Sequence, residues 1–165
     1  TGTLQSFDNS RVAACLAAKK IINSDCGLTD FPQTPPNFVT TLKSQGLCAK
    51  TDPTNTLNKH RYLLDIDGNT SSWHRFWLIG RFGCVPIRFE TKWVEYWHKN
   101  IEEGKHFLYA NRETLSEIVD FLRKHPEKAM SVANNASKFI RDELSPFCAQ
   151  KSFEEAWVSR IHSRY

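Results

Sequence analysis

Short apolar runs alternate with helix-like stretches through the middle of the chain. The runs at 61–66 and 84–89 are apolar enough for buried strands, and the stretch at 71–81 between them has helical spacing. An aromatic stretch at 92–99, which we interpret as a short helix, precedes a third apolar run at 107–110. Strand, helix and strand in this order predict a βαβ unit, whose crossover places helices against the faces of a parallel sheet.

Further helical patterns flank this unit on both sides. Before it, an alanine-rich stretch at 11–23 predicts a helix, and most of the prolines lie in a connection around a short helix near 38–45. After it, apolar positions within 114–124 fall on one helical face, and a second helix is predicted to run from 126 to about 144.

The tail at 146–165 also has a helical pattern. Phe153, Trp157 and Ile161 recur every four residues and form an apolar stripe. We expect this helix to pack across the sheet and to close a single domain spanning 1–165. The predicted fold class is therefore α/β, a Rossmann-like parallel sheet flanked by helices.

Composition agrees with one folded domain. The 165 residues are 40% hydrophobic, which is enough to bury one sizeable core. The net charge of +4 suits an anionic ligand, whereas the lysines and arginines are dispersed rather than gathered into a basic stripe. We therefore expect no nucleic-acid partner.

The sequence shows no targeting or membrane segment. Because no apolar run approaches the ~20 residues that span a bilayer, we expect no membrane span. The start, TGTLQSFDNSR, has neither the basic beginning nor the apolar run of a secretory signal. Since it also lacks an initiator methionine, we expect a further segment upstream.

Five cysteines are spread along the chain without a C-x-x-C pair, so no zinc site is expected. Cys15 and Cys84 lie among apolar residues, which is typical of core thiols. Cys26 and Cys48 lie beside turn residues and would pair with each other only in an oxidising compartment. The odd count leaves the compartment open.

The stretch YLLDIDGNTSSWHRF at 62–76 carries the candidate chemistry. One interpretation follows the Asp-x-Asp-Gly-x-Thr order of haloacid-dehalogenase phosphatases, with Asp65 as the nucleophile and Asp67 as its acid-base partner. That chemistry also needs Mg²⁺ held by further carboxylates, and the sequence downstream shows no such set at a suitable spacing. The phosphatase stays as an alternative.

A second interpretation places an anion at the turn after the aspartates. Ligands of a βαβ unit sit beyond the carboxyl ends of the strands, where helix N–H groups and the helix dipole attract phosphates. Gly68 permits a tight turn, residues 69–72 offer donors, and Arg75 reaches the same anion with paired N–H bonds. Because Asn, Thr and Ser are also ordinary helix caps, the turn alone leaves a structural role open.

Four segments in order resemble glycosyltransferase family 90, of the capsule-associated and protein O-glucosyltransferase type. They are RYLLDIDGNTSSWHRFW, GCVPIRFETKWVEYW, KHF and LSEIVDFLRKHPEKAMSVANNASKFIRDEL. The resemblance extends from about Asn9 over most of the chain. It implies the C-terminal, nucleotide-sugar-binding half of a GT-B-type glycosyltransferase.

The resemblance also implies a reaction and a donor site. The donor would be UDP-glucose or UDP-xylose, and its sugar would pass with inversion to a protein or glycan hydroxyl without a metal or other cofactor. Carried over by position, the donor-binding residues are Arg11, Gly68, Asn69, Thr70, Ser71, Ser72, Trp73 and Arg75. Two departures, Glu103-Gly104 in place of a Pro-Trp pair and Tyr109 in place of a proline, affect the loop after the aromatic stretch.

The catalytic residue stays unassigned, because the family's catalytic carboxylate and acceptor site would lie upstream of Thr1. This motivates a second hypothesis, a non-catalytic remnant or interaction module with the same fold. Relatives of the eukaryotic type work in the lumen of the endoplasmic reticulum or Golgi, whereas bacterial ones work in the cytoplasm, and the sequence leaves both open.

Several polar and aromatic residues are expected to have structural roles. We expect Asp67 to accept N–H bonds within the turn and Asp65 to cap a helix or contact the backbone. Trp93, Tyr96 and Trp97 are interpreted as core or interdomain aromatics, with a sugar-stacking platform as the alternative.

Overall fold

A parallel sheet of three strands forms the centre of the computed structural model, which describes residues 6–31, 33–49, 57, 59–72 and 74–162. Strands β1 (Tyr62–Asp65), β2 (Val85–Phe89) and β3 (Leu108–Ala110) lie in the order β1-β2-β3. Both pairings are parallel, so the carboxyl ends of all three strands meet at one edge. Each strand lies inside its predicted range, and the predicted βαβ unit is confirmed.

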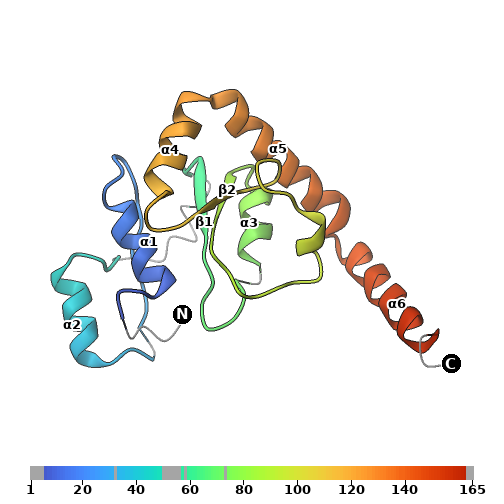
Figure 1. Cartoon of the computed structure of the whole chain (residues 1–165), viewed down its shortest axis with the longest axis horizontal. Coiled ribbons are helices and arrows are strands. Elements are labelled where there is room, and N and C mark those ends of the chain that lie inside the picture. The colour runs from blue at the N-terminus through green and yellow to red at the C-terminus, as the bar shows by residue number, and fades with distance from the viewer. Residues whose placement is uncertain (1–5, 32, 50–56, 58, 73, 163–165) are drawn as a thin grey trace.

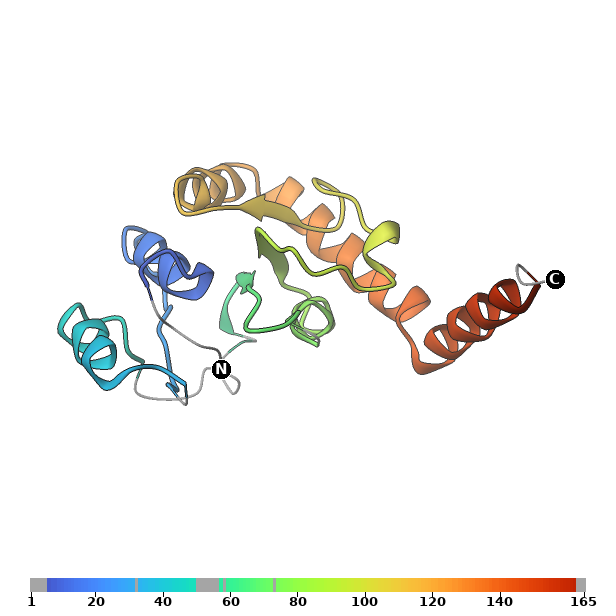
Figure 2. The ribbon, with the colours of Figure 1, turned by 60° about the horizontal axis from the view of Figure 1, so that its bottom comes forward.

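Strand β2 is buried at every position because it has a strand on each side and helices on both faces. Its Val85, Ile87 and Phe89 belong to one core with α1 (Ser10–Ala18), α4 (Leu115–Lys124) and the start of α5 (Pro126–Glu143). Helix α3 (Arg75–Arg81) packs on the opposite face together with the later part of α5. Figures 1 and 2 show α1 and α4 beside each other on one side of the sheet and α3 on the other.

A smaller cluster holds the N-terminal segment together. Helix α2 (Pro36–Ser44) contributes Leu42, which is fully buried with Val12 of α1 and Leu47. Two prolines precede or begin α2, where a missing N–H costs nothing, so the predicted short helix starts earlier than position 38.

Two predicted helices are shorter in the structure. The helix predicted at 11–23 ends at Ala18, because the Ser24 hydroxyl donates to the Ala18 carbonyl and Asn23 turns the chain with a φ of 61°. In the aromatic stretch predicted as a helix at 92–99, the only helical turn is the 3₁₀ turn η2 (His98–Asn100).

Helix α6 (Pro146–His162) forms as predicted, but its predicted packing across the sheet is wrong. It extends away from the body of the domain (Figure 1), and Phe153 and Trp157 are 68% and 59% exposed. Both faces of the sheet are already covered, one by α1 and α4 and the other by α3 and the later part of α5. Among the described residues, no helix is long and apolar enough to cross a membrane.

Helices α3 and α5 cross at a glycine. Gly80 is buried, and a Cβ atom added there would overlap Ile140 Cδ1 and lie 3.3 Å from the Ala136 carbonyl oxygen. Two helices approach this closely only where one of them lacks a side chain, because interiors are packed too densely to absorb an extra methyl group. Gly80 therefore sets the distance between α3 and α5.

We expect Gly80→Ala to lower the free energy of unfolding by about 1–3 kcal/mol, because the added methyl group overpacks the α3–α5 contact. Urea unfolding measures this cost. In an Ile140→Val background, which lacks the Cδ1 atom, the same substitution should cost clearly less. If Gly80→Ala lowers the free energy of unfolding equally in both backgrounds, the added methyl group does not overlap Ile140.

Candidate functional site

Loops from all three strands and the start of α1 meet at the carboxyl edge of the sheet. Two hollows lie there, of about 530 and 370 Å³. They are adjacent because Glu90 and Thr91, which follow β2, line both. A Rossmann-like sheet binds its ligands at this edge, so the hollows occupy the expected place.

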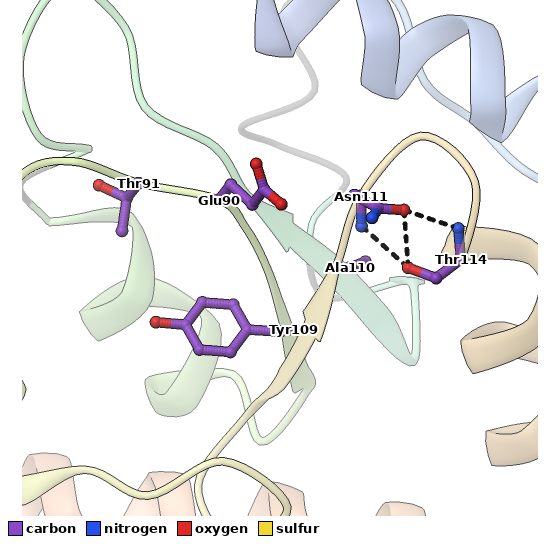
Figure 3. Close-up of a pocket in the computed structure, with 6 residues that line it drawn as sticks. All are labelled: Glu90, Thr91, Tyr109, Ala110, Asn111 and Thr114. Atoms are coloured by element: carbon purple, nitrogen blue, oxygen red, sulfur yellow. Dashed lines mark hydrogen bonds between the residues drawn. The ribbon is translucent and has the colours of Figure 1, made fainter.

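The larger hollow lies between the ends of β2 and β3. Figure 3 shows Glu90 and Tyr109 at its sides, with Asn111 and Thr114 where β3 leads into α4. Asn111 Oδ1 accepts the N–H groups of Glu113 and Thr114 at 2.9 and 2.8 Å, in the turn between β3 and α4. Asn111 therefore fixes the turn that leads into α4.

The smaller hollow lies at the turn after β1. It is lined by Asn9, Ser10, Asp67, Gly68, Glu90, Thr91, Lys92 and Trp93. Asp67 Oδ1 accepts the Ser72 N–H at 2.8 Å and Oδ2 accepts the Thr91 hydroxyl, so this carboxylate ties the turn to the loop after β2. The expectation that Asp67 accepts an N–H bond within the turn is confirmed.

Asp65 forms a buried ion pair with Arg88, in place of the expected helix cap or backbone contact. Both residues are only 3% exposed, and they are register partners on β1 and β2. Arg88 Nε lies 3.0 Å from Asp65 Oδ2, although its N–H direction makes the contact an ion pair rather than a hydrogen bond. The Ser72 hydroxyl donates to the other carboxylate oxygen. Burial raises the pKa of Asp65, and the Arg88 charge and the Ser72 bond oppose that rise.

Aromatic side chains and a histidine complete the surroundings of Arg88. Its guanidinium lies 5.3–5.7 Å from the ring centres of Phe76, Trp97 and Phe107. One terminal nitrogen lies 3.1 Å from His98 Nε2. Burial and the Arg88 charge lower the pKa of His98, which favours the neutral ring that accepts this bond. The predicted core role of Trp97 is confirmed by its burial and stacking on Phe76.

The helix predicted from position 71 begins at Arg75 instead. Side chains from distant segments hold the residues before it, since the Ser71 hydroxyl donates to Glu95 and the Ser72 hydroxyl to Asp65. Asn69 donates to Gln33 Oε1 at 2.8 Å, and the Thr70 hydroxyl donates to the Ser71 carbonyl at 3.4 Å. Trp73 lies outside the described residues.

Arg11 and Arg75 bring two positive charges to this turn. Arg11 Nε donates to the Asp67 carbonyl at 2.9 Å, so the first turn of α1 contacts the turn after β1. Burial lowers the pKa of Arg11, and the charge of Arg75 lowers it further. Neither arginine lines the two hollows themselves. Two half-buried cations that repel each other are an arrangement that a bound anion would stabilise.

The described residues contain no group of three or more His, Cys, Asp or Glu side chains that could hold a metal ion.

Sequence reasoning overlooked Arg88, Glu90, Thr91 and Asn111. A detectable signal existed for Arg88, because it is the lone charge inside the apolar run at 84–89. Glu90 and Asn111 directly follow strands, which is where side chains reach the ligand edge.

Comparison with known proteins identifies the family. The model of glycosyl transferase family 90 matches residues 25–147, which is more than half of the chain. The chain belongs to glycosyltransferase family 90. It is therefore a glycosyltransferase domain, as the resemblance of the sequence segments implied. No curated protein gives a significant match to this family 90 domain.

A solved structure supports the fold of the family 90 domain. It is the crystal structure of the C-terminal domain of a glycosyl transferase group 1 family protein from Francisella tularensis, with a TM-score of 0.53 at 11% sequence identity. The similarity covers 88% of this chain and 84% of that one. The predicted fold class, one half of a GT-B-type glycosyltransferase, is confirmed.

Substitution of either partner of the buried ion pair should destabilise the family 90 domain strongly. Asp65→Asn and Arg88→Met each leave one buried charge unpaired, and we expect each to cost about 3–5 kcal/mol of unfolding free energy. The double variant removes both charges and should cost much less than the sum. Urea unfolding of the four proteins measures this coupling, and additive costs would contradict it.

The pH dependence of Arg88→Met provides a second readout. Loss of Arg88 removes the charge that opposes the raised pKa of Asp65, so this pKa rises further. A carboxyl whose folded pKa exceeds its unfolded value stabilises the fold at low pH and loses that contribution as the pH rises through the folded pKa. Arg88→Met should therefore lose stability relative to the double variant as the pH rises from about 4, the ordinary pKa of an Asp carboxyl, towards the raised pKa of Asp65 in the folded state.

Proposed function

We propose that this domain binds the diphosphate of a UDP-sugar, such as UDP-glucose or UDP-xylose, for inverting transfer of the sugar to a protein or glycan hydroxyl. The observation that carries the proposal is the pair of half-buried, mutually repelling arginines, Arg11 and Arg75, beside the Gly68 turn. A diphosphate between the two guanidinium groups would relieve their repulsion and would accept charge-assisted hydrogen bonds from both.

The turn residues have separate roles in this proposal. Gly68 lacks a side chain and lines the smaller hollow, so a phosphate can approach its backbone closely. Ser71 and Ser72 use their hydroxyls on Glu95 and Asp65, which fixes the turn in position. Asn69 and Thr70 are exposed at its tip, where they would meet the donor from the solvent side.

Glu90 is suited to the hydroxyl groups of the donor. It lines both hollows, and a carboxylate there would repel phosphate oxygens but would accept hydrogen bonds from ribose or sugar hydroxyls. The diphosphate then lies toward the arginines and the hydroxyl-bearing part toward Glu90. The hollow beside Tyr109 would hold the remaining part of the nucleotide or the sugar.

The arginines would also act on the reaction itself. In an inverting transfer the acceptor oxygen attacks the anomeric carbon while the bond to the diphosphate breaks, and UDP leaves with the bonding electrons. Negative charge then grows on the leaving phosphate, where Arg11 and Arg75 stabilise it. A base must take the proton of the acceptor hydroxyl. None of the described residues is assigned to that role.

Two alternatives are less well supported. A phosphatase would need Asp65 to attack a phosphate, but Asp65 is 3% exposed and is engaged by Arg88 and Ser72. A non-catalytic module with the same fold is motivated by the unassigned base. Such a module would bind UDP without ever releasing sugar from a UDP-sugar, whereas a transferase domain completed by its base releases it.

Arg75→Ala should raise the dissociation constant for UDP by about tenfold or more, because a charge-assisted hydrogen bond to phosphate is lost. Isothermal titration calorimetry with UDP measures this, and Arg11→Ala should have an effect in the same direction. The matched control is Arg141→Ala, which removes an exposed arginine of α5 whose side chain bonds to Ser137. Equal affinity for UDP in the unmodified protein, Arg75→Ala and Arg11→Ala would refute this site.

A further inference from the structure

The sulfur atoms of two cysteines are in contact, one on the first helix and one in the loop after it. Cys15 Sγ on α1 lies 3.4 Å from Cys26 Sγ in the loop that follows, and both are free thiols. This pairing differs from the expected one, in which Cys26 was matched with Cys48. Formation of an S–S bond of ~2.05 Å from this contact requires only a small side-chain movement.

The loop that carries Cys26 is held in place from its other side. The Leu28 N–H donates to the Leu47 carbonyl at 2.8 Å, and the Ala49 N–H donates to the Leu28 carbonyl at 3.0 Å. Gly27 packs so closely against Ala49 that an added Cβ atom would lie 2.8 Å away. Cys26 therefore stays beside Cys15 because the surrounding backbone is fixed.

The two thiols differ in environment. Cys15 is buried at 3% exposure, and its pKa is raised by the hydrogen bond with Cys26 and by burial. Cys26 is partly exposed, and its pKa is lowered chiefly by the same hydrogen bond. Cys26 is thus the thiol that an oxidant reaches first, and Cys15 is the one placed to attack next.

We propose that Cys15 and Cys26 are a redox-sensitive pair that closes to an intramolecular disulfide when the domain meets a low-molecular-weight disulfide such as oxidised glutathione. This inference does not depend on UDP binding. The two thiols have no part in the proposed donor site.

The exchange balances in two steps. The Cys26 thiolate attacks one sulfur of the oxidant, forms a mixed disulfide and releases one small thiolate. Cys15 then loses its proton, attacks the Cys26 sulfur and releases the second small thiol, which carries that proton away. The protein loses two protons and two electrons, and these convert one molecule of oxidised glutathione into two molecules of reduced glutathione.

The bridge would tie α1 to the loop that follows it. Cys15 lies one helical turn after Arg11, so the covalent link would anchor the helix whose first turn contacts the Asp67 carbonyl. Closure of this short loop would stabilise the folded state mainly by restricting the unfolded chain. Oxidation should therefore raise the melting temperature without a change in fold.

Peptide mapping under non-reducing conditions tests the proposal directly. After oxidation with glutathione disulfide and alkylation of free thiols, trypsin separates the three nearby cysteines into peptides 12–19, 21–43 and 44–50. We expect peptides 12–19 and 21–43 to be joined. A link between 21–43 and 44–50, or complete alkylation of all five thiols, would overturn the proposal.

Thermal unfolding provides the second readout. Oxidation should raise the melting temperature of the unmodified protein by about 5 °C or more. Cys26→Ser should show no such rise. The control Cys148→Ser should keep the rise, because Cys148 lies at the start of α6, on the far side of the domain from α1 (Figure 1). If Cys26→Ser retains the rise, the stabilising link does not involve Cys26.

Discussion

The buried ion pair between Asp65 and Arg88 is the constraint on which the site depends. The two residues are register partners on neighbouring strands, and their side chains lie on the same face of the sheet. Asp65 also accepts the Ser72 hydroxyl, and Arg88 contacts His98. One charge pair thus anchors both the turn after β1 and the segment after β2, which together form the smaller hollow. Unpaired, either charge would be costly to bury, so the two residues require each other.

This anchoring explains how two arginines come to lie beside the same turn at the carboxyl edge of a three-stranded sheet. With Ser71, Ser72 and Asp67 engaged inside the protein, the turn keeps one shape, and its Asp67 carbonyl receives Arg11 from α1. Arg75 follows as the first residue of α3. The positive charge at this edge therefore comes from two separate helices, and the buried pair holds the turn that separates them.

The sequence was sufficient for features that depend on local pattern. Strand positions, the order of elements and the loop-fixing role of Asp67 followed from apolar runs and turn chemistry. Features that depend on distant contacts were not accessible in this way. Helix α3 starts at Arg75 because Glu95 and Asp65 accept hydrogen bonds from the hydroxyls of Ser71 and Ser72. Cys26 contacts Cys15 because α1 ends at Ala18 and the chain then turns back alongside this helix. The stripe of α6 indicated a helix, but it could not show that other helices already cover both faces of the sheet.

The central claim is that a nucleotide diphosphate binds at the carboxyl edge of the sheet. Titration of the ¹⁵N-labelled domain with UDP, followed by amide correlation spectra, tests this claim most directly. We predict chemical-shift changes concentrated at Ser10, Gly68 and the segments 90–92 and 111–114, which surround the two hollows. Changes confined to the opposite edge, near Arg61 and Gly83, or no changes with UDP in large excess, would contradict the account.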